Sequence, residues 1–140
     1  MLLEHGYEVA VCCPSDSVPG LSGLDGRIER LSWPDVCAGK ALSGRDIWCV
    51  PEGWPNAMAP ALKLQARVLV YVQNWIHLLT TLPPKVRWKQ LPVKYLSVSE
   101  PVSWFMREVL ELESLAVLPP SVADCFFAAG QERVAKEHGE

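Results

Sequence analysis

Short apolar runs alternate along this chain with stretches of helical periodicity. The apolar runs lie at residues 7–12, 46–50, 67–72, 94–98 and 115–118, with a weaker alternating run at 27–31. Several of them end in polar or small residues, and helix candidates separate them at 34–42, 57–65, 75–79 and 102–112. Apolar strands that alternate with helices are typical of parallel sheets with crossover helices. The pattern therefore predicts an α/β fold of three layers, with helices flanking a mostly parallel sheet of about six strands.

The two ends of the chain carry weaker signals. Gly6 follows a short stretch with helix character at residues 1–5, in the position typical just past a helix C-terminus. A helix of that length is not stable alone, so we expect the chain to start late, with a strand, a loop and most of a helix missing in front. Residues 128–138 predict a polar helix with a thin apolar face, which we expect to pack on a part that is not present in this sequence.

Composition excludes several classes of protein. The chain has 140 residues, enough for one domain, and 49% are hydrophobic, which supports a real core and argues against disorder. With 21% charged residues and a net charge of −3, it is not a nucleic-acid binder driven by phosphate neutralisation. No apolar run approaches the roughly 18 residues of a transmembrane helix, and the N-terminus does not resemble a secretory signal. Five cysteines, without a Cys-x-x-Cys spacing, favour reduced thiols and a cytoplasmic protein.

Ligands of parallel sheets bind at the carboxyl ends of the strands, so the residues there are the candidate site. Glu52 and Gly53 follow one predicted strand, Gln73 and Asn74 the next, Ser99 and Glu100 a third, and Ser121 the last. Each has a structural interpretation as well. Gln73 and Asn74 can tie neighbouring loops together, and Ser99 can cap the following helix, with Glu100 in its first turn near the positive end of the dipole.

Five segments, in order along the chain, resemble those of GT-B glycosyltransferases. Residues 2–11 (LLEHGYEVAV) are similar to the turn from the first helix into the second strand. Residues 46–52 (DIWCVPE) and 68–74 (VLVYVQN) resemble the "D-x-x-x-x-P-E" and "VxxxQN" strand ends of bacterial members. Residues 95–100 (YLSVSE) look like the "v-a-v-S-e" segment, and residues 115–122 (LAVLPPSV) like the segment that closes the N-terminal domain, with Pro-Ser in place of Asn-Gly.

The resemblance covers Leu2 to Phe127 and implies a Rossmann-like fold. It divides the chain into an incomplete N-terminal domain at 1–127 and a helical tail at 128–140 that leads toward a second domain. It implies the acceptor-binding half of an enzyme that moves a sugar from a nucleotide-sugar to a carbohydrate or lipid-linked acceptor. The nucleotide-sugar would be held by the C-terminal domain, which is missing here. We therefore expect no cofactor in this piece, no activity from it alone, and exposed apolar surface that favours self-association.

Other chemical signals are weaker. Glu100 and Glu108 match the Glu-x7-Glu spacing of retaining members, but a chain with eleven glutamates is expected to contain such a pair by chance, and the family's pair belongs to the missing domain. No cluster has metal-ligand spacing, so no metal is expected. A basic loop holds Lys85, Arg87 and Lys89 around Trp88; it is either a solvated loop or a contact with anionic lipid at the inner face of a membrane.

A second class of function stays open. The chain can also be a non-catalytic Rossmann-like module that binds other proteins. A crevice lined by Glu52, Gln73, Asn74 and Ser99 would favour the transferase half, whereas a closed, apolar surface would favour the interaction module. A small flavodoxin-like enzyme fits less well, because no phosphate-binding loop follows the first strand.

Overall fold

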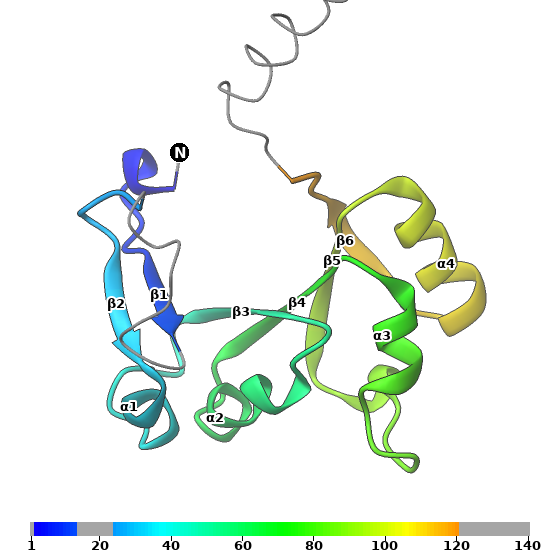
Figure 1. The fold of residues 1–140 in the computed structure, drawn as a ribbon, viewed down its shortest axis with the longest axis horizontal. Coiled ribbons are helices and arrows are strands. Elements are labelled where there is room, and N and C mark those ends of the chain that lie inside the picture. Colours follow the sequence, from blue (N-terminus) through cyan, green and yellow to red (C-terminus); the bar gives the residue numbers. More distant parts are fainter. Residues whose placement is uncertain (1, 14–23, 121–140) are drawn as a thin grey trace, which may run out of the picture.

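A computed structural model describes residues 2–13 and 24–120 of the chain (Figure 1). The elements between residues 2 and 63 are η1 (Leu3–His5), β1 (Ala10–Cys13), β2 (Glu29–Ser32), α1 (Trp33–Cys37), β3 (Ile47–Pro51), η3 (Pro55–Ala57) and α2 (Met58–Lys63). Those that follow are β4 (Arg67–Val72), α3 (Trp75–Thr80), η4 (Trp88–Gln90), β5 (Val93–Ser97), α4 (Glu100–Leu110) and β6 (Ser114–Val117). The predicted tail helix at 128–138 and Ser121 lie outside the described residues.

The predicted α/β class with parallel strands is confirmed. All six described strands pair in parallel, as expected from their apolar sequences. They do not form one sheet, however: β1 pairs with β2 in a two-stranded sheet, and β3, β4, β5 and β6 form a four-stranded sheet in that order. The number of strands follows from the sequence, but their division between two sheets does not.

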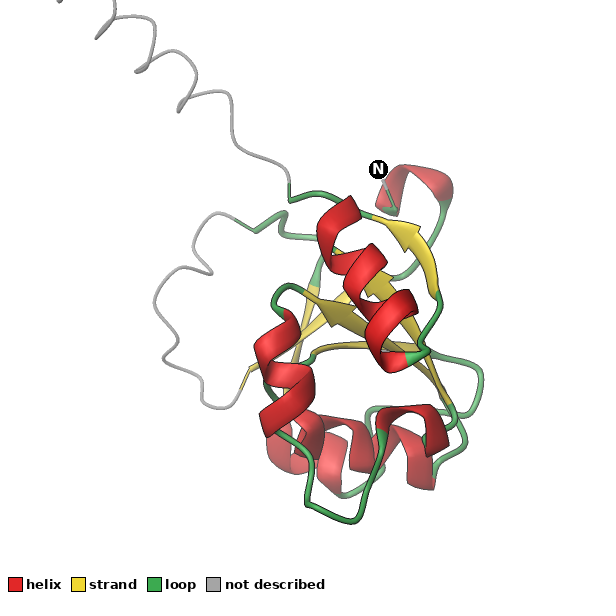
Figure 2. Cartoon of the chain, turned by 90° about the vertical axis from the view of Figure 1, so that its right-hand side faces the viewer, coloured by secondary structure: helices red, strands yellow, loops and turns green. Residues whose placement is uncertain are grey.

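The helices cover one face of the four-stranded sheet. Its strands follow one another in sequence order, so right-handed crossovers place α2, α3 and α4 on the same side. Burial alternates accordingly. In β4, Val68, Val70 and Val72 are buried, whereas Leu69 and Tyr71 on the other face are only half-buried. Figure 2 shows the helices in front of and below the strands. The described residues therefore form two layers here, and the expected third layer is not among them.

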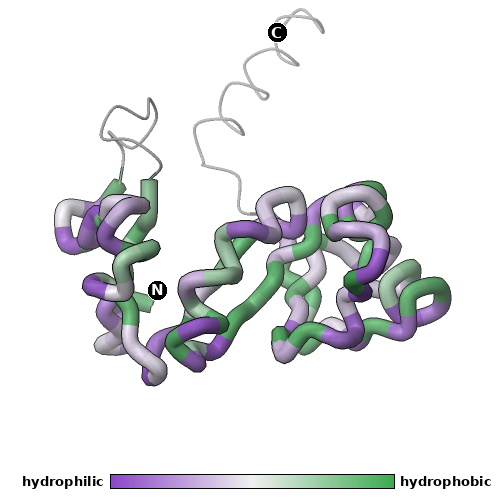
Figure 3. Tube along the Cα trace, turned by 90° about the horizontal axis from the view of Figure 1, so that it is seen from below, coloured by the Kyte–Doolittle hydropathy of each residue, from purple (hydrophilic) through white to green (hydrophobic). Residues whose placement is uncertain are grey.

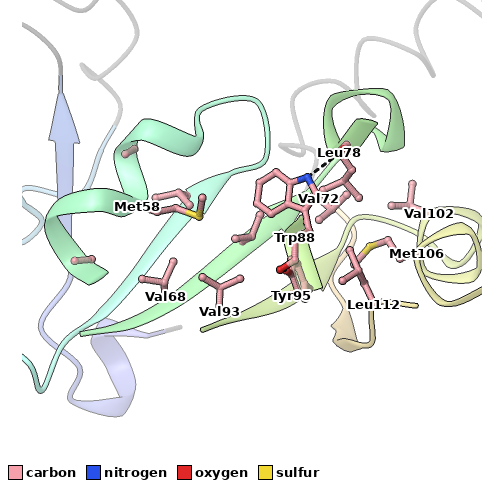
Figure 4. Packing of buried hydrophobic residues seen from close by; sticks show 14 of the residues in the cluster. Met58, Val68, Val72, Leu78, Trp88, Val93, Tyr95, Val102, Met106 and Leu112 are labelled. Atoms are coloured by element: carbon pink, nitrogen blue, oxygen red, sulfur yellow. Dashed lines mark hydrogen bonds between the residues drawn. The ribbon is translucent and has the colours of Figure 1, made fainter. Parts of the chain in front are cut away.

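The core lies between this sheet and its helices. Fifteen buried hydrophobic residues form one cluster, and all of them fall between Val50 and Leu112. Trp88 and Tyr95 meet edge to face with ring centroids 6.3 Å apart, near the middle of the cluster (Figure 4). Met106 reaches the cluster from α4 and is fully buried. Such packing of apolar side chains holds the strand ends in fixed positions for the candidate site.

The N-terminal strands contribute little to this core. The residues of β1 and β2 are half-buried or exposed, and α1 supplies one buried residue, Val36. Figure 3 shows this part set apart from the four-stranded sheet. A ring contact connects the two parts: the centroid of Trp33, at the start of α1, lies 5.2 Å from that of Trp54, which follows β3.

Helix ends follow the sequence signals at some positions and not at others. Gly6 adopts the left-handed conformation (φ 79°) after η1, and Ser32 caps α1 by accepting a hydrogen bond from the Asp35 N–H. The helix predicted at 57–65 begins at Met58, and Asn56, before it, lies inside the short turn η3. Pro55 starts this turn two residues before the predicted helix, since its fixed φ suits the first helical position.

Candidate functional site

The carboxyl ends of β3, β4 and β5 lie side by side and bring most of the predicted site residues to one edge of the sheet. Pro51 pairs with Tyr71, and Val72 pairs with Ser97, so the residues that follow these strands are neighbours. Glu52 and Asn74 contact each other directly. Ser99 begins the turn into α4 beyond the next strand.

Glu52 is the buried charged residue of this edge. Only 2% of its surface is exposed, and its Oε1 accepts a hydrogen bond from the Asn74 N–H at 2.8 Å. Its backbone carbonyl accepts a hydrogen bond from the Thr81 hydroxyl at 3.2 Å. The second carboxyl oxygen, Oε2, is buried and has no hydrogen-bond partner. Burying a carboxylate oxygen without a partner costs free energy, so this atom is the unsatisfied polar group of the edge.

Asn74 has a structural role in addition to its contact with Glu52. Its side-chain Oδ1 accepts a hydrogen bond from the Ile76 N–H at 3.0 Å, and Asn74 is the N-cap of α3. The Asn74 side chain thus stabilises the start of its own helix, whereas the bond to the neighbouring strand end at Glu52 comes from the Asn74 backbone N–H. Gln73, the residue before it, has an exposed side chain at the same edge.

Ser99 occupies the expected N-cap position of α4, but the predicted cap hydrogen bond is wrong. The Ser99 side chain accepts no hydrogen bond from the helix, and its carbonyl accepts from the Ser103 N–H instead. Pro101 is the second residue of α4 and has no N–H, so one of the two amides that a cap normally binds is absent. Glu100 lies in the first turn, as expected, and is exposed.

The other residues at the end of β3 form an aromatic surface. Gly53 is exposed, and an added side-chain carbon there would lie 3.9 Å from the His77 ring, so the backbone does not require glycine. Trp54 is 36% exposed and contacts the half-buried Trp33. Trp33 was not among the predicted site residues. The signal that points to it is its place directly after β2, which corresponds to the place of Trp54 after β3.

The remaining candidates are accounted for by structure. Glu108 is exposed and forms an ion pair with Arg107, the neighbouring residue, at 2.8 Å. In the basic loop, Trp88 is buried and donates a hydrogen bond from Nε1 to the Leu78 carbonyl at 2.8 Å. Lys89 forms an ion pair with Glu111, at 2.6 Å. Lys85 and Arg87 are the other two cations of this loop, and their side chains are exposed.

An open hollow of about 600 Å³ lies elsewhere, between β2, α1 and the segment that leads to β3. Charged side chains of both signs line it, among them Arg30, Asp35, Lys40 and Asp46. None of the predicted site residues takes part in this hollow. This hollow is therefore not the crevice that the sequence predicts at the strand ends.

The described residues carry neither a metal cluster nor a membrane span. Within residues 2–13 and 24–120, no group of three His, Cys, Asp or Glu side chains is placed to hold a metal ion. Over the same residues, no helix is both long and apolar enough to cross a membrane. The thiols of Cys12, Cys13, Cys37 and Cys49 are free.

Comparisons with protein-family models, curated proteins and solved structures found no match to this chain.

Proposed function

We propose that this chain is the acceptor-binding half of a GT-B-like glycosyltransferase, and that the carboxyl ends of β3, β4 and β5 receive the acceptor. Three observations support the proposal: the parallel α/β fold, the ordered motifs of the sequence, and the convergence of Glu52, Asn74 and Ser99 at one edge. Ligands of parallel sheets bind at this edge. A donor nucleotide-sugar would be held by a second domain, so the chain alone is expected to transfer no sugar.

The unpartnered Oε2 of Glu52 carries the proposal. A sugar hydroxyl donates a hydrogen bond, and a carboxylate oxygen is a strong acceptor for it. Oε2 is covered, so the side chains around it must move aside before a hydroxyl reaches it. The Trp33–Trp54 pair lies at the ends of β2 and β3, and its partly exposed rings offer an apolar surface to the C–H face of a sugar.

A binding experiment tests this assignment. Amide resonances of the whole chain would be followed by NMR while glucose or N-acetylglucosamine is added. We expect shifts confined to residues 33, 52–54, 73–74 and 99. In Glu52→Gln, which keeps the shape of the side chain, the affinity should fall about tenfold or more, because a hydrogen bond to a charged group contributes about 1.5–3 kcal/mol.

Glu108→Gln is the matched control, since Glu108 is exposed and lies on α4 away from its N-terminal turn. It should bind like the unchanged chain. The proposal is wrong if neither sugar shifts the resonances of the strand ends, or if Glu52→Gln binds both sugars as well as the unchanged chain does.

In the same proposal the enzyme is cytoplasmic and works at the inner face of a membrane. The exposed cations Lys85 and Arg87 would attract anionic headgroups, and the exposed side chains of Ile76 and Leu79 on the preceding helix would add apolar contact. These surfaces are also where self-association is expected if no membrane is present.

A non-catalytic interaction module is the second candidate. The observation in its favour is the number of large apolar side chains that stay exposed on the sheet and on α3 and α4, such as Ile47, Leu115, Leu79 and Trp104. Tight binding of a protein, together with no response to sugars, would favour this function over the first.

A further inference from the structure

Glu52 is the one charged residue that is buried in the part of the chain that the structure describes. Every Lys and Arg side chain of that part is exposed. Burying a carboxylate is costly unless a cation or several hydrogen-bond donors compensate its charge. The compensation that Glu52 receives therefore indicates which kind of ligand its site can take.

Within the described residues, the compensation of Glu52 is incomplete. Its Oε1 accepts one hydrogen bond, from the Asn74 N–H at 2.8 Å, and its Oε2 accepts none. The two oxygens of a carboxylate can together accept about four hydrogen bonds. The ion pairs of residues 2–13 and 24–120 involve other carboxylates, and none joins Glu52 to a Lys, Arg or His. The negative charge of Glu52 thus lacks a countercharge in this part of the chain.

Glu52 lies close to the surface, although its own side chain is covered. Its neighbours in the chain, Pro51 and Gly53, are exposed, and so is its hydrogen-bond partner Asn74. Glu52 is buried at the end of β3 and is not part of the hydrophobic cluster, which contains Val50 and Ala57 on either side of it in the sequence. A ligand at the strand ends would therefore reach Oε2 by displacing groups of the surface and not of the core.

A neutral ligand and a cationic ligand satisfy a buried carboxylate to different degrees. A sugar hydroxyl donates one hydrogen bond and brings no charge, so the charge of the carboxylate stays uncompensated. A protonated amine brings a positive charge and has three N–H donors. Hydrogen bonds that involve charged groups are also about twice as strong as those between neutral groups. The surroundings of Oε2 therefore favour an amine over a hydroxyl.

We propose that the acceptor received at this edge is an amino sugar, and that Glu52 Oε2 accepts hydrogen bonds from its unsubstituted, protonated amino group. This rests on the proposed function, since it takes the ends of β3 and β4 as the acceptor site, and it narrows the acceptor to sugars with a free amine. Trp54, two residues after Glu52 and 36% exposed, supplies apolar surface for the sugar ring. Glu52 is thus a specificity-determining residue, which distinguishes a free amine from an acetylated one.

Four ligands separate the amine from the rest of the sugar. Glucosamine, N-acetylglucosamine and glucose share one ring and differ only at carbon 2, which carries an ammonium, a neutral amide or a hydroxyl. Ethanolamine carries the amine without the ring. Each ligand is titrated into the whole chain at about pH 6, where the amines are protonated, and the Kd is obtained from the amide resonances of residues 52–54 and 73–74. We expect glucosamine to bind at least tenfold more tightly than the other three.

Two matched substitutions test the role of the carboxylate. Glu52→Gln keeps the shape of the side chain, and its amide oxygen can still accept the Asn74 N–H, but the charge is removed. We expect the preference for glucosamine over glucose to disappear in this variant. Glu108→Gln makes the same change at an exposed position of α4 and should keep the preference. Circular dichroism checks that both variants are folded, and the comparison of the four ligands on the unchanged chain needs neither of them.

Three results would overturn this inference. Glucosamine could bind no more tightly than glucose, or its advantage could persist in Glu52→Gln. The third is equal affinity for ethanolamine and glucosamine, which would mean that the site takes a free amine and not a sugar. If no sugar shifts the resonances of the strand ends, the proposed function fails together with this inference, whereas equal affinity for the three sugars excludes only the preference for an amine.

Discussion

Tyr95 connects three consecutive parts of the chain through hydrogen bonds in the core. Its hydroxyl, on β5, donates to the Trp88 carbonyl of η4 at 2.8 Å, and the Trp88 indole donates to the Leu78 carbonyl of α3. Desolvation by burial raises the pKa of Tyr95 to about 12, from a model-compound value of 10.0. The neutral phenol is thus the form that the folded state stabilises.

The raised pKa of Tyr95 makes stability sensitive to alkaline pH. An unfolded tyrosine ionises near pH 10 and the folded one near pH 12, so this contribution is complete below pH 10 and is lost as the pH rises toward 12. Tyr95→Phe should be less stable by about 1 kcal/mol at pH 8 because the hydrogen bond is lost. At pH 11 that difference should narrow by about 1 kcal/mol. Urea unfolding at both pH values measures it, and an equal difference at both would contradict the assignment.

At the scale of elements, two helix starts that look alike in sequence differ in the structure. Both α3 and α4 follow a polar residue with extended backbone, Asn74 and Ser99. Asn74 Oδ1 accepts the Ile76 N–H, whereas the Ser99 hydroxyl makes no cap bond. Because a side-chain cap contributes about 1 kcal/mol, only one of these residues should matter for stability.

A matched pair of substitutions tests that difference. Asn74→Ala should lower the free energy of unfolding by about 1 kcal/mol, because an amide at the start of α3 loses its partner. Ser99→Ala should change it by less than about 0.5 kcal/mol, the usual range for substitutions that remove no such contact. Denaturant unfolding of both variants at pH 7 compares them. Equal losses would mean that Ser99 caps α4 in solution.

These same elements show how far sequence reasoning reaches. The strand at 67–72 follows from an apolar run, which is a local signal. The cap at Asn74 also has a local signal, a polar residue directly before a helix candidate, but it was not among the predictions. The missing cap at Ser99 depends on Pro101, and the unpartnered Oε2 of Glu52 depends on a neighbouring strand. The Trp33–Trp54 contact joins residues of two sheets. The features of Glu52 and of the two tryptophans arise from tertiary contacts, which the spacing of residues along one chain does not determine.

At the scale of the whole molecule, burial is distributed unevenly. The buried cluster lies entirely between Val50 and Leu112, while the strands β1 and β2 contain no buried residue. Free energies of local opening follow the buried apolar contacts of each part. The four-stranded sheet and the N-terminal pair of strands should therefore open independently of each other.

Hydrogen exchange of the native chain measures this independence. Amides of β4 and β5 should exchange only through global unfolding, since both strands are paired on each side and packed against buried side chains. Amides of β1 and β2 should exchange at least tenfold faster, because their opening exposes little apolar surface. A low concentration of urea should accelerate amide exchange in β4 and β5 more steeply than in β1 and β2, since global unfolding exposes more surface.

Met106→Ala, a substitution in the buried cluster, is expected to accelerate exchange in β4 and β5 and to leave β1 and β2 unchanged. If the substitution accelerates exchange in all four strands alike, the chain unfolds as one cooperative unit and the division into two parts is wrong.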